Sequence, residues 1–237
     1  MNENLHIQNF LQTLSEEGKR VLFEQLKIEI GIHPLESEIG LSGDAVLSAI
    51  QKMRAEAPLT WRMLRGVLAE TTYGVNVLTK IVGWSDITPV GDLPYDYLIT
   101  NGTVNIRIHI KLQRSKDFVA MTANQARKGF RNDMYVVETQ KTRGGKDELG
   151  SDTRPYRFNE FDILAVCMQP STGKWDDYMY SLDKWLIPDP KNSNLLLKFQ
   201  PVAMIPNNDW TDSLETAISW FMEANAQPKT IAWSYLP

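Results

Sequence analysis

The chain contains very little cysteine or histidine, which excludes several kinds of site. Cys167 is the only cysteine among 237 residues, so no internal disulfide can form. Only three histidines accompany it, which does not support a zinc site of nitrogen and sulfur ligands. The sequence also lacks the phosphate-binding pattern G-x-x-x-x-G-K-S/T, the dinucleotide-binding pattern G-x-G-x-x-G and the serine-hydrolase pattern G-x-S-x-G. We therefore expect none of these chemistries.

Long apolar runs and a strongly basic charge are missing too. No stretch approaches the roughly 18 uncharged apolar residues that a membrane helix needs. The polar start at residues 1–4, followed by an amphipathic run, predicts no secretory signal and a cytoplasmic protein without a membrane partner. The formal charge of −4 disfavours indiscriminate coating of nucleic acid. It is compatible with a site-specific nuclease, which clusters acidic residues around a metal and keeps basic residues local to its groove.

Helical patterns come first along the chain. Residues 5–28 have the spacing of an amphipathic helix. Residues 35–53 predict a helix, a turn at Gly40 and a second helix capped by Ser42. This is a candidate helix-turn-helix for DNA, although two short helices joined at a glycine are common in any helical subdomain. A third helix is expected over residues 58–80, with a buried stripe formed by Leu64, Leu68, Val75 and Leu78.

Strand patterns begin at Tyr95. Runs rich in valine, isoleucine and aromatic residues occupy 95–100, 104–113, 134–139 and 161–168. The glycine- and charge-rich residues 142–153 predict an exposed loop, and a last helix is expected over 211–223. We therefore predict an α/β fold, with a mixed β-sheet flanked by helices in residues 58–237 and an N-terminal helical lobe in residues 1–57.

The segment from Tyr95 to Gln113 predicts a hairpin with one polar face. From Val104 onward apolar and polar residues alternate, and Asn101–Gly102 supplies the residues of a tight turn. A two-residue loop would place Asp96 opposite Arg107, whereas a four-residue loop would place it opposite His109. Either register puts Asp96, His109 and Lys111 on one face. The sequence does not choose between them, and an ordinary solvated sheet face alternates in the same way.

Glu70 adds a second carboxylate from the preceding helix. It follows Ala69, and Gly66 lies one turn earlier, in the run RGVLAE. Small residues let a helix approach a sheet closely, so we expect Glu70 to be partly buried. A buried carboxylate needs a partner, and a divalent cation shared with Asp96 would be one.

Taken in order, these features resemble the active site of the PD-(D/E)XK nucleases. The features are a helix bearing Glu70, a strand that begins Pro94-Tyr95-Asp96, and Lys111 fifteen residues later. The segments KLQRSK, YVVETQKTRGG and TRPYRFNEFDILAV are similar to those of certain type II restriction endonucleases, over roughly residues 60–201. The resemblance implies a restriction-endonuclease-like core, Mg²⁺ as cofactor and sequence-specific hydrolysis of double-stranded DNA. It also implies a cognate DNA methyltransferase as a functional companion.

The resemblance assigns roles to four residues. Asp96 and Glu70 should bind the metal, and Lys111 should orient or polarise the attacking water. His109 departs from the family, which has Asp or Glu there, sometimes Gln. Since Mg²⁺ prefers hard oxygen ligands, three explanations remain open: Glu70 replaces the missing carboxylate, the site is weakened or inactive, or the position has been altered. His109 could also act as an acid or base near neutral pH, although a lone histidine on a strand is more often structural.

The region after the catalytic strands supplies candidate DNA contacts. Arginine can read guanine edges and glutamine adenine edges, and any single candidate could instead sit on a solvated loop. The candidates are Arg114, Gln140, Lys141, Arg143, Arg154 and Arg157. Cutting both strands of a palindromic site would require a homodimer. A structure-directed repair or junction nuclease remains an alternative, and so does a non-catalytic DNA-binding protein on a decayed nuclease core, which His109 keeps open.

Overall fold

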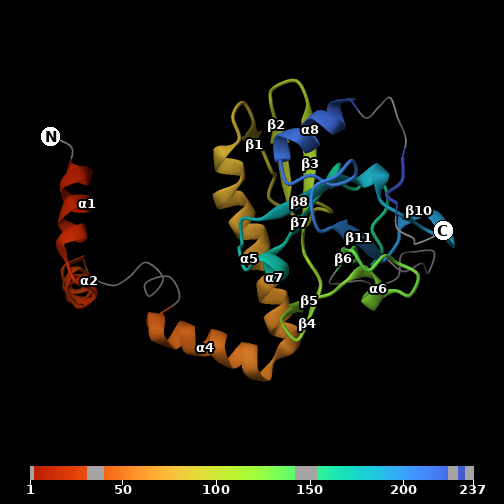
Figure 1. Cartoon of the computed structure of the whole chain (residues 1–237). Coiled ribbons are helices and arrows are strands. Elements are labelled where there is room, and N and C mark those ends of the chain that lie inside the picture. The colour runs from red at the N-terminus through yellow and green to blue at the C-terminus, as the bar shows by residue number, and fades with distance from the viewer. Residues whose placement is uncertain (1–2, 31–39, 142–153, 224–228, 233–237) are drawn as a thin grey trace. The chain divides into compact units, whose positions relative to one another are not determined.

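The computed structural model describes residues 3–30, 40–141, 154–223 and 229–232 and divides into two compact units (Figure 1). The first unit is Met1–Arg62 and the second is Met63–Pro237. Within the described ranges, no helix is both long enough and apolar enough to cross a membrane.

The first unit consists of helices. They are α1 (Glu3–Thr13), α2 (Glu16–Ile30), α4 (Gly43–Glu56) and the first turn of α5 (Pro58–Asn76). The single helix expected over residues 5–28 was wrong, because the hydroxyl of Ser15 accepts a hydrogen bond of 3.1 Å from the amide of Gly18 and starts a new helix. The predicted cap of α4 is confirmed, since the Ser42 hydroxyl accepts from the amide of Ala45. The first half of the candidate helix-turn-helix lies outside the described residues.

The second unit is built on a five-stranded mixed sheet. Its order is β1 (Ser85–Asp86), β2 (Tyr97–Thr100), β3 (Asn105–Leu112), β7 (Ile163–Cys167) and β8 (Tyr178–Leu182). The pairing of β3 with β7 is parallel, and the other three pairings are antiparallel. This confirms the predicted α/β class with a mixed sheet flanked by helices. The expected patterns missed β8, because all its side chains are buried and it shows no polar alternation.

The hairpin adopts the four-residue loop. Thr100 pairs with Asn105 and Tyr97 with Ile108, and the amide of Asp96 donates to the Ile108 carbonyl at 3.0 Å. Asp96 therefore stands opposite His109. The side chain of Asn101 selects this register, since its Oδ1 accepts the amides of Thr103 and Val104 at 2.9 and 2.8 Å.

Helix α5 packs on one face of the sheet through Tyr73, which is fully buried. Its ring lies 5.7, 4.9 and 6.3 Å from the rings of Tyr97, Tyr178 and Tyr180, respectively. The predicted stripe was wrong at two of its four positions, because Leu68 and Val75 are 36% and 62% exposed, whereas Leu64 and Leu78 are partly buried. The buried positions of α5 are Arg65, Ala69 and Tyr73.

Gly74, rather than Gly66, makes the close approach of α5 to the sheet. A Cβ atom at Gly74 would lie 2.5 Å from the Tyr97 hydroxyl, whereas one at Gly66 would meet nothing within 4 Å. The same hydroxyl donates to the Glu70 carbonyl at 2.9 Å, and the Tyr178 hydroxyl donates to the Ala69 carbonyl at 2.6 Å. After Asn76 the chain continues into a short 3-10 helix, η1 (Leu78–Lys80), so the regular helix is shorter than the expected 58–80.

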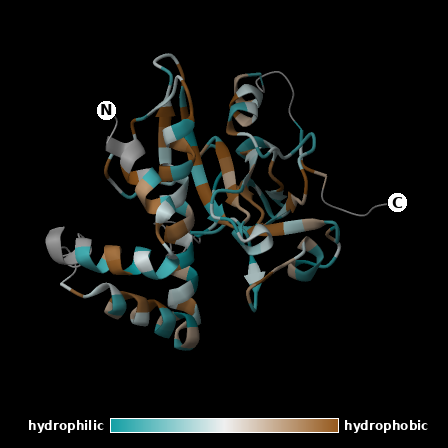
Figure 2. Ribbon diagram, turned by 60° about the vertical axis from the view of Figure 1, so that its left-hand side comes forward, coloured by the Kyte–Doolittle hydropathy of each residue, from teal (hydrophilic) through white to brown (hydrophobic). Residues whose placement is uncertain are grey.

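The rest of the unit consists of short elements around the sheet. Strand β6 (Met134–Glu138) pairs antiparallel with β11 (Phe199–Ala203). The last helix, α8 (Leu214–Glu223), begins later than expected. The remaining elements are β4 (Ser115–Lys116), β5 (Val119–Ala120), α6 (Ala123–Ala126), α7 (Gln169–Thr172), η2 (Asp183–Trp185), β9 (Pro188–Asp189) and β10 (Asn192–Leu196). Hydrophobic residues concentrate on the central strands (Figure 2).

Candidate active site

Asp96 presents a carboxylate beside the start of β2. Its Oδ2 accepts the amide of Ile110 at 2.5 Å and lies 2.8 Å from Nδ1 of His109. Burial raises the pKa of Asp96. His109, the Ile110 amide and the Lys111 ammonium together lower this pKa by more than burial raises it, so the pKa lies below its ordinary value. Asp96 is therefore ionised at neutral pH, as a metal ligand must be.

Lys111 lies on the same face of β3, one alternation beyond His109. Its Nζ donates to the Tyr156 hydroxyl at 3.3 Å and stands 5.1 Å above that ring. Burial lowers the pKa of Lys111, while Asp96 and Glu70 oppose the shift by favouring the charged form. The hydroxyl and ring of Tyr156 thus contact the lysine, and the two carboxylates favour its charged form.

Glu70 approaches this group from α5. Partial desolvation and the negative charge of Asp96 raise the pKa of Glu70, whereas Lys111 lowers it. The charges of Asp96 and Lys111 therefore both act on the Glu70 carboxylate. Glu70 is exposed and not partly buried as expected, because α5 turns Ala69 onto the sheet. The three residues that the sequence singled out thus come from α5, the start of β2 and β3, and the charges of Asp96 and Glu70 both act on Lys111.

His109 is a buried aromatic neighbour of this cluster. It is 4% exposed, and its ring centroid lies 4.6 Å from that of Tyr156 and 5.1 Å from that of Phe161. Burial, followed by Lys111, lowers the pKa of His109, whereas Asp96 raises it. Nε2 has no hydrogen-bond partner among the described residues, and Nδ1 faces Asp96 without good hydrogen-bond alignment. His109 thus packs against Oδ2 of Asp96 where a carboxylate was expected.

The donor set fits a divalent ion only if substrate and water complete the coordination. In the ranges that the structure covers, no three His, Cys, Asp or Glu side chains form a metal-binding group. However, Mg²⁺ in phosphoryl-transfer sites commonly takes one or two carboxylates, with substrate phosphates and waters as the other ligands. Asp96 and Glu70 meet that requirement. Both described contacts of the Asp96 carboxylate fall on Oδ2, which leaves Oδ1 for an ion.

The predicted DNA contacts divide into residues near the cluster and residues apart from it. Lys141 belongs to the cluster, because its Nζ lies 5.3 Å over the Tyr156 ring and 2.8 Å from Oε1 of Glu160. Arg114 pairs with Glu138, at the end of β6. Gln140 forms an isolated bridge with Pro155, and Arg154 and Arg157 are exposed. Arg143 lies outside the described residues.

Tyr156 was not recognised as a site residue from the sequence. It was interpreted as core, and it is indeed only 5% exposed. Its ring nevertheless supports Lys111, Lys141 and His109 together. No local pattern distinguishes such a tyrosine, because its partners come from strands 15 to 47 residues away in sequence.

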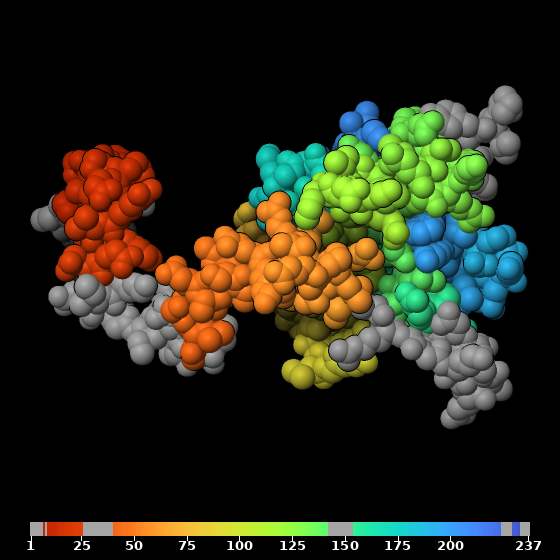
Figure 3. Space-filling view, turned by 90° about the horizontal axis from the view of Figure 1, so that it is seen from below, coloured from red at the N-terminus to blue at the C-terminus, as the bar shows by residue number. Residues whose placement is uncertain are grey.

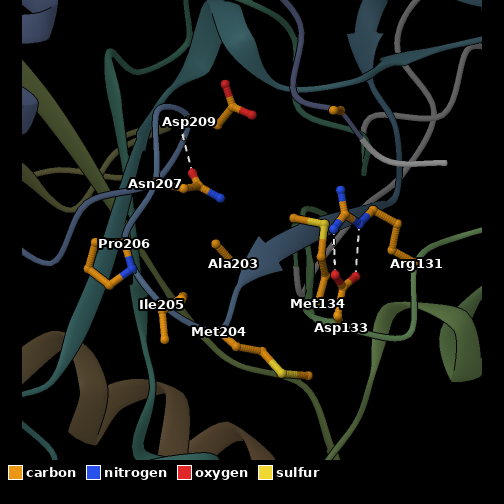
Figure 4. Close-up of a pocket in the computed structure, with 10 residues that line it drawn as sticks. Arg131, Asp133, Met134, Ala203, Met204, Ile205, Pro206, Asn207 and Asp209 are labelled. Atoms are coloured by element: carbon orange, nitrogen blue, oxygen red, sulfur yellow. Dashed lines mark hydrogen bonds and ion pairs between the residues drawn. The ribbon is translucent and has the colours of Figure 1, made fainter. Parts of the chain in front are cut away.

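A separate pocket of about 420 Å³ lies at the end of the β6–β11 pair where Met134 pairs with Ala203 (Figure 4). Met134 and Ala203 line it, whereas Glu138 and Phe199 are paired at the other end of these strands. Arg131 and Asp133, on its rim, form an ion pair with each other. The pocket contains none of the predicted site residues.

No protein-family model and no curated protein matches the chain. Among solved structures, the chain is similar to a bacterial homing endonuclease, I-Ssp6803I, at 18% sequence identity. The match covers 71% of this chain and 98% of that one, with a TM-score of 0.37. A similarity this low carries no argument about function, so the candidate site rests on its own geometry.

Proposed function

We propose that the chain is a metal-dependent DNA endonuclease whose active site comprises Asp96, Glu70 and Lys111. The observation that supports the proposal is that Asp96 lies beside His109, on the face of β3 that carries Lys111, with the charges of Asp96 and Lys111 acting on Glu70 of α5. Hydrolysis of a phosphodiester needs an activated water and compensation of the negative charge that develops on the phosphate. A pair of carboxylates beside an ammonium group suits that reaction.

Each residue of the cluster has a distinct part in this proposal. Asp96 and Glu70 would hold Mg²⁺, which, when bound, lowers the pKa of a water and acts as a Lewis acid on the phosphate. Lys111 adds a positive charge next to the phosphate, and the Tyr156 hydroxyl restricts its position. The Ile110 amide fixes the Asp96 carboxylate through Oδ2, and His109 packs against the same oxygen.

The finer proposal is a type II restriction enzyme. It includes cleavage at a short palindromic sequence by a homodimer, in a cytoplasm where a DNA methyltransferase protects the host sites. The support for it is the ordered resemblance of Glu70, Asp96 and Lys111 to the PD-(D/E)XK motif. Discrete fragments from plasmid DNA would agree with this proposal, whereas cutting of branched DNA alone would favour a repair or junction nuclease.

The test uses plasmid DNA with Mg²⁺ and the substitutions Asp96→Asn and Lys111→Met. Each should reduce the cleavage rate by about 100-fold or more, the usual effect of losing one electrostatic contact to the transition state. Asp176→Asn is the matched control, because Asp176 is an exposed carboxylate two residues before β8. Circular dichroism should show that all three variants remain folded. Unchanged cleavage in either site variant would refute the assignment.

His109 favours a second candidate, a DNA-binding protein on a nuclease core that no longer cuts. The observation is that Nδ1 of His109 lies 2.8 Å from Oδ2 of Asp96, at a position where the PD-(D/E)XK nucleases have a carboxylate. In that case the wild-type protein binds a specific DNA sequence without cleaving it, and His109→Glu leaves both properties unchanged. If His109→Glu produces cleavage in a silent wild-type protein, the site lacks only that one ligand.

A further inference from the structure

Phe199, the first residue of β11, contacts two cationic side chains. The guanidinium carbon of Arg114 is 5.1 Å from its ring centroid, and Nζ of Lys198 is also 5.1 Å from it. Cations over an aromatic ring are attracted by the ring quadrupole. The ring therefore holds an arginine and a lysine close together although their charges repel.

Glu138 is the carboxylate shared by these two cations. Its Oε2 pairs with Nη1 of Arg114, and its Oε1 lies 3.4 Å from Nζ of Lys198. Two positive charges thus share one negative charge. The Arg114 and Lys198 side chains are 31% and 47% exposed, and Nε of Arg114 has no acceptor within the described part of the chain. The group carries an excess positive charge that solvent can reach.

The backbone fixes this group beside the proposed active site. Arg114 follows Lys111 by three residues, and its amide donates to the Val136 carbonyl at 2.9 Å. Glu138 is the register partner of Phe199, and its charge raises the pKa of Lys111. Figure 3 shows the surface from the end at which β3 finishes, where the residues that follow β3 (green) lie beside those of β11 (blue).

We propose that Arg114 and Lys198 form a binding site for a DNA backbone phosphate next to the phosphate that Lys111 contacts. This rests on the proposed function. An incoming phosphate would replace Glu138 as the partner of both cations, and an arginine can bind it in a bidentate manner. Phe199 holds both side chains in place before binding, which reduces the loss of side-chain freedom. The site recognises phosphate and carries no information about base sequence.

The proposal makes opposite predictions for the cations and for the carboxylate. Arg114→Met and Lys198→Met should each weaken binding to a labelled DNA duplex and reduce the slope of log affinity against log salt concentration by about 0.9. Glu138→Gln should strengthen binding several-fold, because it frees both cations. If the group were only a surface ion-pair network, Glu138→Gln would leave DNA affinity unchanged. That result, together with unaltered slopes for the two methionine variants, would overturn the proposal.

The measurement is a salt titration of duplex binding without divalent ions, in which no cleavage occurs. Lys184→Met is the matched control, because it removes the same charge as the two test substitutions. Lys184 follows β8, at the opposite end of the sheet from Arg114. It should leave the slope unchanged. Altered slopes in a protein that never cleaves DNA would refute the proposed function alone. Cleavage with unaltered slopes would refute this site alone, and a wild-type protein that binds no duplex would refute both.

Discussion

Asp183 places a carboxylate in the interior next to an ion pair that is already satisfied. It is 6% exposed, and its Oδ2 accepts the amide of Asn159 at 2.8 Å. Nearby, Arg107 binds Asp162 through two nitrogens, at 2.7 and 2.9 Å. Burial raises the pKa of Asp183 to about 6, and the backbone amide of Asn159 only partly offsets this. Asp183 therefore takes up a proton on mild acidification.

This raised pKa predicts an unusual pH dependence of stability. Between about pH 4 and pH 6 the folded protein binds more protons at Asp183 than the unfolded chain does, so this residue's contribution to the free energy of unfolding falls as pH rises. Above pH 6 the full cost is present, about 3 kcal/mol for a shift of roughly two units. Asp183→Asn should remove this slope and stabilise the protein above pH 6.

Urea unfolding of wild type and Asp183→Asn at several pH values measures the effect. The difference between their free energies of unfolding should grow from pH 4 to pH 6 and then remain constant. Asp176→Asn, at an exposed position, controls for the general loss of a carboxylate. A difference that does not vary with pH would contradict the prediction.

At the scale of residues, the sequence predicted which side chains of one strand share a face. It predicted less well which side chains from distant segments lie close together. The alternation of β3 placed His109 and Lys111 on one face, because a period of two is a local property of a strand. The turn left two registers, and the hydrogen bonds of the Asn101 side chain decide between them. The group around Phe199 was not predicted, since it depends on the pairing of β6 with β11 over about 60 residues.

Helix α5 positions Glu70 through its contact with the sheet. The sequence predicted the helix and a close approach through Ala69 and Gly66; Ala69 is fully buried, whereas Gly66 faces open space. The stripe of leucine and valine residues on α5 was expected to be buried, yet Tyr73 and the tyrosines of the sheet form the contact between α5 and the sheet. Helical periodicity identifies several faces with apolar residues, and only the shape of the sheet selects one of them. The rotation of a helix about its axis is therefore a tertiary property.

The glycines of α5 give a matched pair of substitutions. Gly74→Ala should destabilise the protein by about 1–3 kcal/mol, because the added methyl would overlap the Tyr97 hydroxyl and the Tyr97 ring is itself packed against Tyr73. Gly66→Ala should stabilise it by about 0.5–1 kcal/mol, since it meets open space in a helix interior. Urea unfolding of both variants measures the two signs. If both substitutions stabilise the protein, then α5 does not approach Tyr97 as closely as the structure indicates.

Gly74→Ala has a functional consequence as well. Glu70 lies one turn before Gly74, and the carbonyl of Glu70 accepts the hydrogen bond of the Tyr97 hydroxyl. Displacing that hydroxyl should move Glu70 relative to Asp96. Under the proposed function, DNA cleavage should therefore fall in Gly74→Ala and remain at the wild-type level in Gly66→Ala, measured under conditions where both proteins are folded.

The two units of the molecule differ in how they are stabilised. Every residue of the described hydrophobic core belongs to the second unit, beginning with Ala69. In the first unit, no side chain whose exposure is described is buried, and Ile7, Phe10, Phe23 and Leu47 are each more than half exposed. The helices α1, α2 and α4 have 11, 15 and 14 residues. Helices of about 12–15 residues are marginal in water without tertiary packing.

Hydrogen exchange followed by mass spectrometry should separate the two units. Amides of α1, α2 and α4 should exchange at least about 100-fold faster than those of β3 and β7, because local opening of an unpacked helix costs little, whereas core strands open only with global unfolding. Equal protection would mean that a partner covers the apolar side chains of the first unit. Repeating the measurement at two protein concentrations and with duplex DNA distinguishes the partners. Protection that rises with protein concentration would support the proposed homodimer. Protection of α4 that requires DNA would support the candidate helix-turn-helix, because the second helix of that motif lies in the major groove.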